Sequence, residues 1–183
     1  MAQITFHPDF IDAFASGQKT TTLRPTDFYC HRSDGMPECD IPPVWFHSER
    51  LEDYASFLHE ASGRKAMLPQ GTRIIWYTGF SDLQKRAPYQ PSDPVELVAK
   101  DDNGGIIPFA TATINDVSVI QWDDITEQHA INDGFVPSMG YSAIGRFFAF
   151  MQSVYPNLSP YQDAFWLYTF TDIRMLPQWR NEA

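Results

Sequence analysis

Residues 164–171 read Ala-Phe-Trp-Leu-Tyr-Thr-Phe-Thr, and this run narrows the possible folds more than any other stretch. Aromatic and branched side chains favour a strand, and here both alternating faces of that strand would be largely apolar. A strand that is buried on both faces lies inside a sheet or barrel rather than at its edge. We therefore expect residues 164–171 to form a central strand.

Other segments supply partners for this strand. Residues 95–100 and 106–114 flank Asn103-Gly104, a pair that strongly favours a β-hairpin. Residues 80–94 contain three of the 14 prolines and are expected to form a surface loop. Further extended segments are expected at residues 3–6, 20–24, 71–78 and 111–122.

Short helices are expected between the strands. Residues 8–16 place Phe10 and Phe14 on one helical face, and Gly17 follows where a left-handed turn commonly ends a helix. Asp124 with Glu127 resembles a capping box for a short helix that Gly134 would end. Two longer helices are expected at residues 49–61 and from an N-cap at Ser138 to Pro156, whose apolar stripe we read as core.

Composition limits the function. The chain has 183 residues, which suits a single domain spanning 1–183. Its net charge of -10, with 23 acidic against 13 basic residues, argues against binding extended RNA, which needs Lys and Arg to neutralise phosphates. No apolar run approaches the ~20 residues that span a bilayer. With two cysteines and no leader pattern at the N-terminus, we expect a cytoplasmic protein without a membrane partner.

Residues 17–24, Gly-Gln-Lys-Thr-Thr-Thr-Leu-Arg, concentrate the most chemistry. Strand alternation would place Thr20, Thr22 and Arg24 on one face. Lys19 would then point to the opposite face, so it joins them only if it belongs to the preceding turn. We expect these side chains to face a solvent-accessible pocket.

This motif, preceded by Ile4-Thr5-Phe6, resembles the signature of the ASCH domain family. Residues 124–135, Asp-Ile-Thr-Glu-Gln-His-Ala-Ile-Asn-Asp-Gly-Phe, are similar to the family's acidic helix. The resemblance implies an α+β fold, a PUA-like mixed β-barrel of five to seven strands with flanking helices. Relative to the minimal barrel, the chain has expected insertions at residues 26–66 and 80–104.

One branch of the family comprises small bacterial amidohydrolases that act on N4-acetylcytidine with a lysine, a threonine and a glutamate. Carried over by position, these catalytic residues fall on Lys19, Thr22 and Asp133. Asp133 is one methylene shorter than the glutamate, so its carboxylate reaches about 1.5 Å less far. The resemblance therefore predicts removal of an acyl group from N4-acylated cytosine or cytidine.

Amide hydrolysis requires that Thr22 lose its proton, and Lys19 accepts it only if burial lowers the pKa of its ammonium group. Asp133 would orient the lysine or protonate the departing amine. The alternative is a structural ion pair between Lys19 and Asp133, with Thr22 as an ordinary strand residue. On that alternative the domain is a binding module for RNA or a modified nucleobase. Ribonuclease activity, also suspected in the family, is a third possibility.

Secondary substrate contacts are expected from side chains with donors or aromatic faces. Arg24 offers a planar fork of donors for a carbonyl, carboxylate or phosphate. The other candidates are Thr20, Trp76, Tyr77 and His129. The spacing of Cys30, His31, Cys39 and His47 matches no tight zinc motif, so we expect no metal. No cofactor is expected, the partner is a small nucleoside or nucleobase, and the sequence leaves the oligomeric state open.

Overall fold

A computed structural model describes residues 1–31, 44–47, 75–78, 83–101, 103–138, 140–156, 158 and 163–179. Within these ranges, side chains are not described for residues 27–31, 44–47, 75–78 and 163. The expected helix at 49–61 and most of the expected insertion at 26–66 lie outside the described residues. No helix among the described residues is long and apolar enough to cross a membrane.

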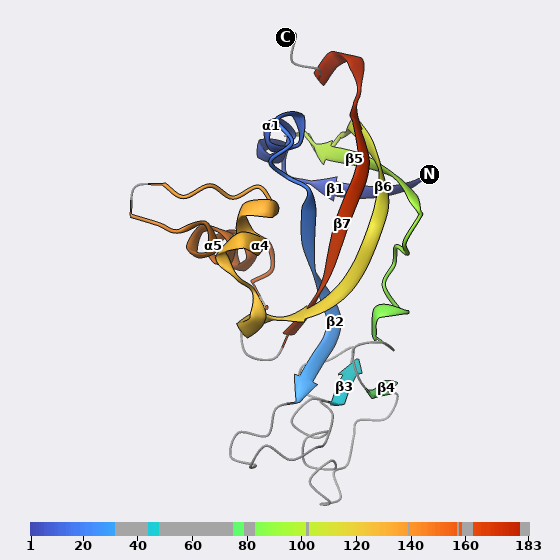
Figure 1. The fold of residues 1–183 in the computed structure, drawn as a ribbon, viewed down its shortest axis with the longest axis vertical. Coiled ribbons are helices and arrows are strands. Elements are labelled where there is room, and N and C mark those ends of the chain that lie inside the picture. The colour runs from blue at the N-terminus through green and yellow to red at the C-terminus, as the bar shows by residue number, and fades with distance from the viewer. Residues whose placement is uncertain are drawn as a thin grey trace, which may run out of the picture.

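The described chain is a mixed α+β structure built on one curled sheet that forms a half-barrel (Figure 1). Its strand order is β1-β5-β6-β7-β2-β3-β4, with β1 and β5 parallel and the other neighbours antiparallel. The strands are β1 (Ala2–Phe6), β2 (Thr21–His31), β3 (Val44–His47), β4 (Ile75–Thr78), β5 (Pro94–Lys100), β6 (Ile106–Gln121) and β7 (Asp163–Met175).

Strand β7 is central, as predicted. It pairs with β6 on one side and with β2 on the other. Residues Ala164, Phe165, Trp166 and Tyr168 are all buried, which explains why its sequence is apolar on both faces. The predicted hairpin is also confirmed, because β5 pairs antiparallel with β6 across Asn103-Gly104.

Two short helical regions and one longer helix flank the sheet (Figure 1). They are η1 (Pro8–Phe10) with α1 (Ile11–Ala15), η2 (Trp122–Asp124) with α4 (Glu127–Asn132), and α5 (Ala143–Val154); η3 (Pro177–Trp179) follows β7.

Two predicted caps are wrong. The capping box of α4 joins Thr126 to His129, because Asp124 already belongs to η2. Helix α5 is capped by Ser142 rather than Ser138.

The expected surface loop at residues 80–94 is largely confirmed in its described part, where the backbone is mostly irregular and Lys85 and Arg86 are exposed, but two of its residues are buried. Leu83 is 0% exposed and Ala87 is 6% exposed, and both belong to the hydrophobic core. The Gln84 side-chain amide donates to the backbone carbonyl of Val117 in β6. Prolines correctly indicated irregular backbone, but they carry no information on whether the apolar residues between them are buried.

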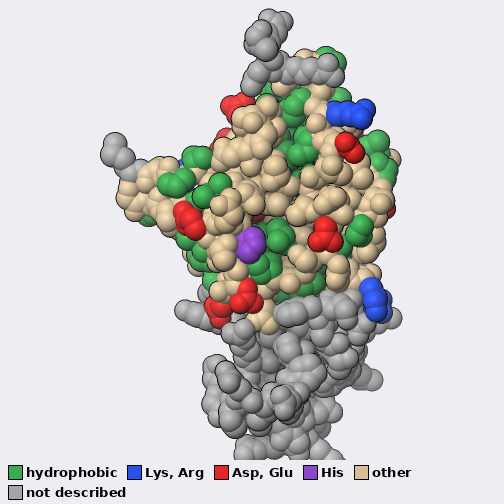
Figure 2. All heavy atoms as spheres, viewed as in Figure 1, with side chains coloured by type: hydrophobic (Ala, Val, Ile, Leu, Met, Phe, Trp, Pro, Cys, Tyr) green, Lys and Arg blue, Asp and Glu red, His purple; other side chains and the backbone are tan. Residues whose placement is uncertain are grey.

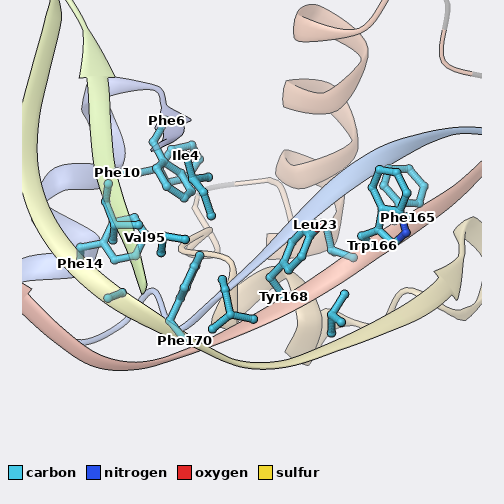
Figure 3. Close-up of a cluster of buried hydrophobic side chains, with 14 of the residues drawn as sticks. Ile4, Phe6, Phe10, Phe14, Leu23, Val95, Phe165, Trp166, Tyr168 and Phe170 are labelled. Carbon is cyan, nitrogen blue, oxygen red and sulfur yellow. The ribbon is translucent and has the colours of Figure 1, made fainter. Parts of the chain in front are cut away.

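The core extends along the concave side and the ends of the sheet. Figure 3 shows Phe6, Phe10 and Phe14 gathered near β1 and α1, while Tyr168 and Trp166 lie along β7. Phe6 contacts Phe14 edge to face with ring centroids 5.0 Å apart. The sequence motif at residues 17–24 therefore begins beside an aromatic cluster.

The free edge of β1 is closed by side chains instead of a further strand. Arg24 of β2 donates through Nη2 to the backbone carbonyl of Thr5. The Tyr89 hydroxyl donates to the carbonyl of Gln3 at 2.7 Å. The Arg24 contact joins β1 to β2 across the opening of the half-barrel, and the Tyr89 contact ties β1 to the segment that precedes β5. We call these two contacts the seam.

Glu127 connects the two main helices, because its carboxylate accepts the N–H groups of Ala143 at 2.7 Å and Ile144 at 3.0 Å. Replacing Glu127 with glutamine should lower the free energy of unfolding by about 1–3 kcal/mol, since hydrogen bonds to a charged cap are lost. Urea denaturation measures this change. The exposed Asp116→Asn is the control and should change stability by less than about 0.5 kcal/mol. If the two variants lowered stability equally, the role of Glu127 in capping α5 would be contradicted.

Candidate functional site

The backbone brings Lys19 to the C-terminal end of α4. Gly17 adopts a left-handed conformation with φ of 75°, which ends α1. The Lys19 N–H then donates to the Ala13 carbonyl at 2.9 Å, and the Thr20 N–H donates to the Asn132 carbonyl at 2.9 Å. Because β2 begins only at Thr21, Lys19 belongs to the turn. The condition for Lys19 to join Thr22 and Arg24 is therefore met.

Lys19 and Asp133 form a buried pair. Lys19 Nζ donates to the Asp133 carboxylate Oδ1 and to the Asp133 backbone carbonyl, the latter at 2.5 Å. The second carboxylate oxygen accepts the Leu23 N–H at 2.9 Å. The two residues are only 1% and 4% exposed. The core therefore closes around the Lys19 side chain and desolvates its amine.

Aromatic rings surround the Lys19 amine. Its Nζ lies 4.5 Å from the ring centroid of Phe10, 5.4 Å from that of Phe6 and 5.6 Å from that of Phe14. Gly134 completes the enclosure with φ of 95°; a Cβ there would lie 3.3 Å from Lys19 Cδ. Rings at these distances stabilise a cation through their π faces but do not replace water.

Burial alters the acid–base properties of both partners. Desolvation lowers the pKa of Lys19, while the charge and hydrogen bond of Asp133 oppose this change. Desolvation also raises the pKa of Asp133, against the opposing effects of Lys19 and the Leu23 N–H. The proton affinities of the amine and the carboxylate therefore approach each other, which suits the pair to accept and return a proton.

A cavity of about 660 Å³ opens onto this pair. Lys19, Thr22, Arg24 and Asp133 all line it. The opposite wall comes from α5 and the chain after it, through Phe147, Met151, Val154 and Tyr155. This volume lies within the range of about 300–1,000 Å³ typical of small-molecule sites.

Arg24 lies at the seam side of the cavity. Its guanidinium carbon lies 4.8 Å above the Phe6 ring centroid, and its Nη2 is bonded to the Thr5 carbonyl. Its Nε is buried and has no hydrogen-bond partner among the described residues. Arg24 therefore holds the seam while part of its donor capacity is unused.

Four other predicted contacts have different positions. Thr20 is fixed by backbone bonds and does not line the cavity. His129 accepts the Thr126 N–H at 3.0 Å through Nδ1, so it caps α4 instead of facing the cavity. Trp76 and Tyr77, expected as substrate contacts, lie on β4, which β3 separates from β2, so their strand does not pair with the strand of the motif. Their side chains are outside the description.

Among the described residues, no group of three His, Cys, Asp or Glu side chains could hold a metal ion. The side chains of Cys30, His31 and His47, and all of Cys39, are outside the description. The prediction that they bind no metal therefore stays a prediction.

Sequence reasoning missed the residues that build the walls. The apolar stripe that contains Phe147 and Met151 was interpreted as core. Both residues do belong to the core, but they also line the cavity. His7 and Asp9 also line it, with His7 Nδ1 3.3 Å from an Asp9 carboxylate oxygen. Helical periodicity identifies an apolar face but does not distinguish a core face from a cavity wall.

Comparisons with known proteins give one structural likeness. No protein-family model matches the chain, and no curated protein matches it. Among solved structures, the chain is similar to protein EF3133 from Enterococcus faecalis V583, which is described with the family model DUF984. The TM-score is 0.47 with 13% identity, and the alignment covers 100% of this chain and 86% of that one.

Proposed function

We propose that the protein is an amidohydrolase that removes the acyl group from N4-acylated cytosine or cytidine, on a PUA-like barrel of the ASCH type. The observation that carries the proposal is the Lys19 amine, 1% exposed and paired with Asp133, in the cavity that Thr22 also lines. This environment gives the lysine a lowered pKa. A neutral amine is the base that a threonine nucleophile needs.

The hydrogen bonds of Lys19 support a role as base. A neutral amine has two N–H bonds and one lone pair. Two acceptors on Asp133, the carboxylate Oδ1 and the backbone carbonyl, match the two N–H bonds. In the neutral state the lone pair is then free to take a proton from the cavity side. Asp133 acts by holding the amine in this orientation.

The proposed reaction proceeds in two steps. Thr22 Oγ1 attacks the acyl carbonyl while its proton moves to Lys19, and the tetrahedral intermediate expels the N4 amine, which takes that proton. Water then attacks the acyl ester of Thr22 and gives a proton to Lys19, which returns it to the departing Thr22 oxygen. The released carboxylic acid loses its proton to solvent, so the protein is regenerated.

Charge favours a small neutral substrate. The net charge is -10, and Figure 2 shows acidic side chains spread over the visible face with few Lys and Arg among them. A phosphate polymer would meet a repulsive field, whereas an uncharged nucleoside would not. This distribution supports the hydrolase over a binder of extended RNA or a ribonuclease.

The test is incubation of purified protein with N4-acetylcytidine. We expect conversion to cytidine, followed by ultraviolet absorbance, with the same rate in the presence of a chelator. Thr22→Ala should show no turnover, and Thr22→Ser should retain part of it because the nucleophilic oxygen remains. Absence of product above the Thr22→Ala control, with several acyl sizes, would overturn the hydrolase.

The buried pair also gives one specific reason for a second candidate, a binding module without chemistry. Asp133 links Lys19 to the Leu23 backbone, which is the pattern of a structural cross-link between α4 and β2. A binding module would retain N4-acetylcytidine without converting it. Calorimetric binding without product formation would favour that candidate.

A further inference from the structure

The cavity that opens onto Lys19 and Thr22 has one wall that is almost entirely apolar. Helix α5 and the residue that follows it contribute to this wall the side chains of Phe147, Phe150, Met151, Val154 and Tyr155. The Tyr155 hydroxyl is the only strong hydrogen-bonding group among these side chains. A ligand surface that lies against the wall therefore loses water without gaining hydrogen bonds, which favours hydrocarbon over polar groups.

Three of these side chains form a track from the core to solvent. Phe147, Met151 and Val154 are spaced four and then three residues apart, so they lie on one face of α5. Their exposed fractions are 0%, 3% and 46% in that order. Seven residues of α-helix rise about 10 Å. The track is therefore buried at one end, open at the other, and longer than the single methyl group of an acetyl substituent.

The polar groups of the cavity lining lie on other elements. Apart from Tyr155 and the proposed catalytic residues, these groups belong to Thr5, His7, Asp9, Arg24, Lys100 and Asp101. Cytosine and ribose carry several hydrogen-bond donors and acceptors, and burying such groups without partners costs free energy. The nucleoside therefore fits the polar part of the cavity, whereas the hydrocarbon chain of the acyl group fits the α5 wall.

We propose that the α5 wall is the acyl site of the hydrolase and selects saturated N4-acyl groups longer than acetyl, such as butyryl or hexanoyl. The acyl carbonyl lies at Thr22, which lines the same cavity, and the chain extends from it along Phe147, Met151 and Val154. Each methylene that leaves water for this wall adds binding energy. The assignment rests on the proposed function and specifies which acyl group that function removes.

A substrate series tests the acyl site on the wild-type protein alone. The series consists of cytidines whose N4 acyl group is acetyl, butyryl or hexanoyl. Burial of one methylene corresponds to a gain of about two- to fourfold. We therefore expect kcat/KM to rise about tenfold from acetyl to butyryl and about tenfold again to hexanoyl, mainly through a lower KM.

A substitution at the open end of the track tests the wall itself. Val154→Asn places a polar side chain where α5 ends, a position at which asparagine is tolerated. The ratio of kcat/KM for hexanoyl to that for acetyl should fall about fivefold, because the chain then meets an amide instead of a methyl surface. The urea midpoint should not change, because the side chain is half exposed.

Val136→Asn is the matched control. Val136 is 46% exposed, as Val154 is, but it lines a neighbouring cavity of about 530 Å³ and not the cavity that contains Thr22. The hexanoyl-to-acetyl ratio of this variant should stay within about twofold of the wild-type ratio. An unchanged ratio in Val154→Asn, or an equal fall in both variants, would overturn the role of the α5 wall.

The acyl site and the proposed function fail in different ways. If the wild-type protein removes all three acyl groups with equal kcat/KM, or prefers acetyl, the acyl site is overturned and the hydrolase stands. If it removes none of them, the proposed function is overturned and the acyl site is overturned with it.

Discussion

Replacement of Lys19 by methionine is expected to abolish hydrolysis and to lower the free energy of unfolding by about 3–5 kcal/mol. Methionine fills much of the same volume, so the effect isolates the loss of the amine. The Asp133 carboxylate, 4% exposed, would keep its Leu23 N–H but lose its charged partner. Turnover of N4-acetylcytidine and urea denaturation measure the two effects.

A second variant separates the two roles of the pair. Lys19→Met combined with Asp133→Leu removes both charges, and replacing a buried ion pair with apolar side chains is often neutral or stabilising. We expect stability to recover only in part, because the buried Leu23 N–H loses its acceptor at a cost of about 1–3 kcal/mol, while activity stays absent. Recovery of activity in the double variant would contradict the assignment of Lys19 as the base.

Replacement of Asp133 by asparagine should move the acidic limb of the pH–rate profile to lower pH by about 1–3 units. The proposed base works when Lys19 is neutral, so the rate rises with pH through the lowered pKa of Lys19. The Asp133 charge opposes that lowering, and removing the charge lowers the pKa further. Initial rates between about pH 5 and 9 reveal the limb.

A limb that stays in place or moves to higher pH would show that Asp133 does not set the pKa of Lys19. Asp133→Glu provides the matched charged control. The resemblance to a glutamate family suggested that the longer side chain would improve reach, but Asp133 already bonds Lys19 directly. An added methylene in this packed place should lower the free energy of unfolding by about 1–3 kcal/mol. It should not move the acidic limb of the pH–rate profile to lower pH.

The sequence predicted elements whose determinants are local. Residues 164–171 are apolar on both faces and do form the central strand β7. Asn103-Gly104 correctly indicated the β5–β6 hairpin. Gly17 correctly indicated the left-handed end of the first helix. In each case neighbouring residues alone decide the backbone conformation.

The sequence did not predict features that depend on distant packing. Lys19 is separated from Asp133 by 114 positions, and the rings around its amine come from β1, η1 and α1. His129 was expected to contact the substrate. Its imidazole instead accepts the Thr126 N–H at the start of α4. The sequence does not show whether a histidine in this position caps its own helix or faces a cavity.

The seam affects whether another chain can add a strand to this edge of the sheet. Strand β1 ends the sheet order, and the exposed backbone of such a strand is a template on which another chain can add a strand. Arg24 and Tyr89 occupy the carbonyls of Thr5 and Gln3 that an incoming strand would need. Arg24 thus protects the strand edge while facing the cavity. A substitution of Arg24 that weakens activity would also uncover an aggregation-prone edge, so the oligomeric state must be measured before the loss is assigned to substrate binding.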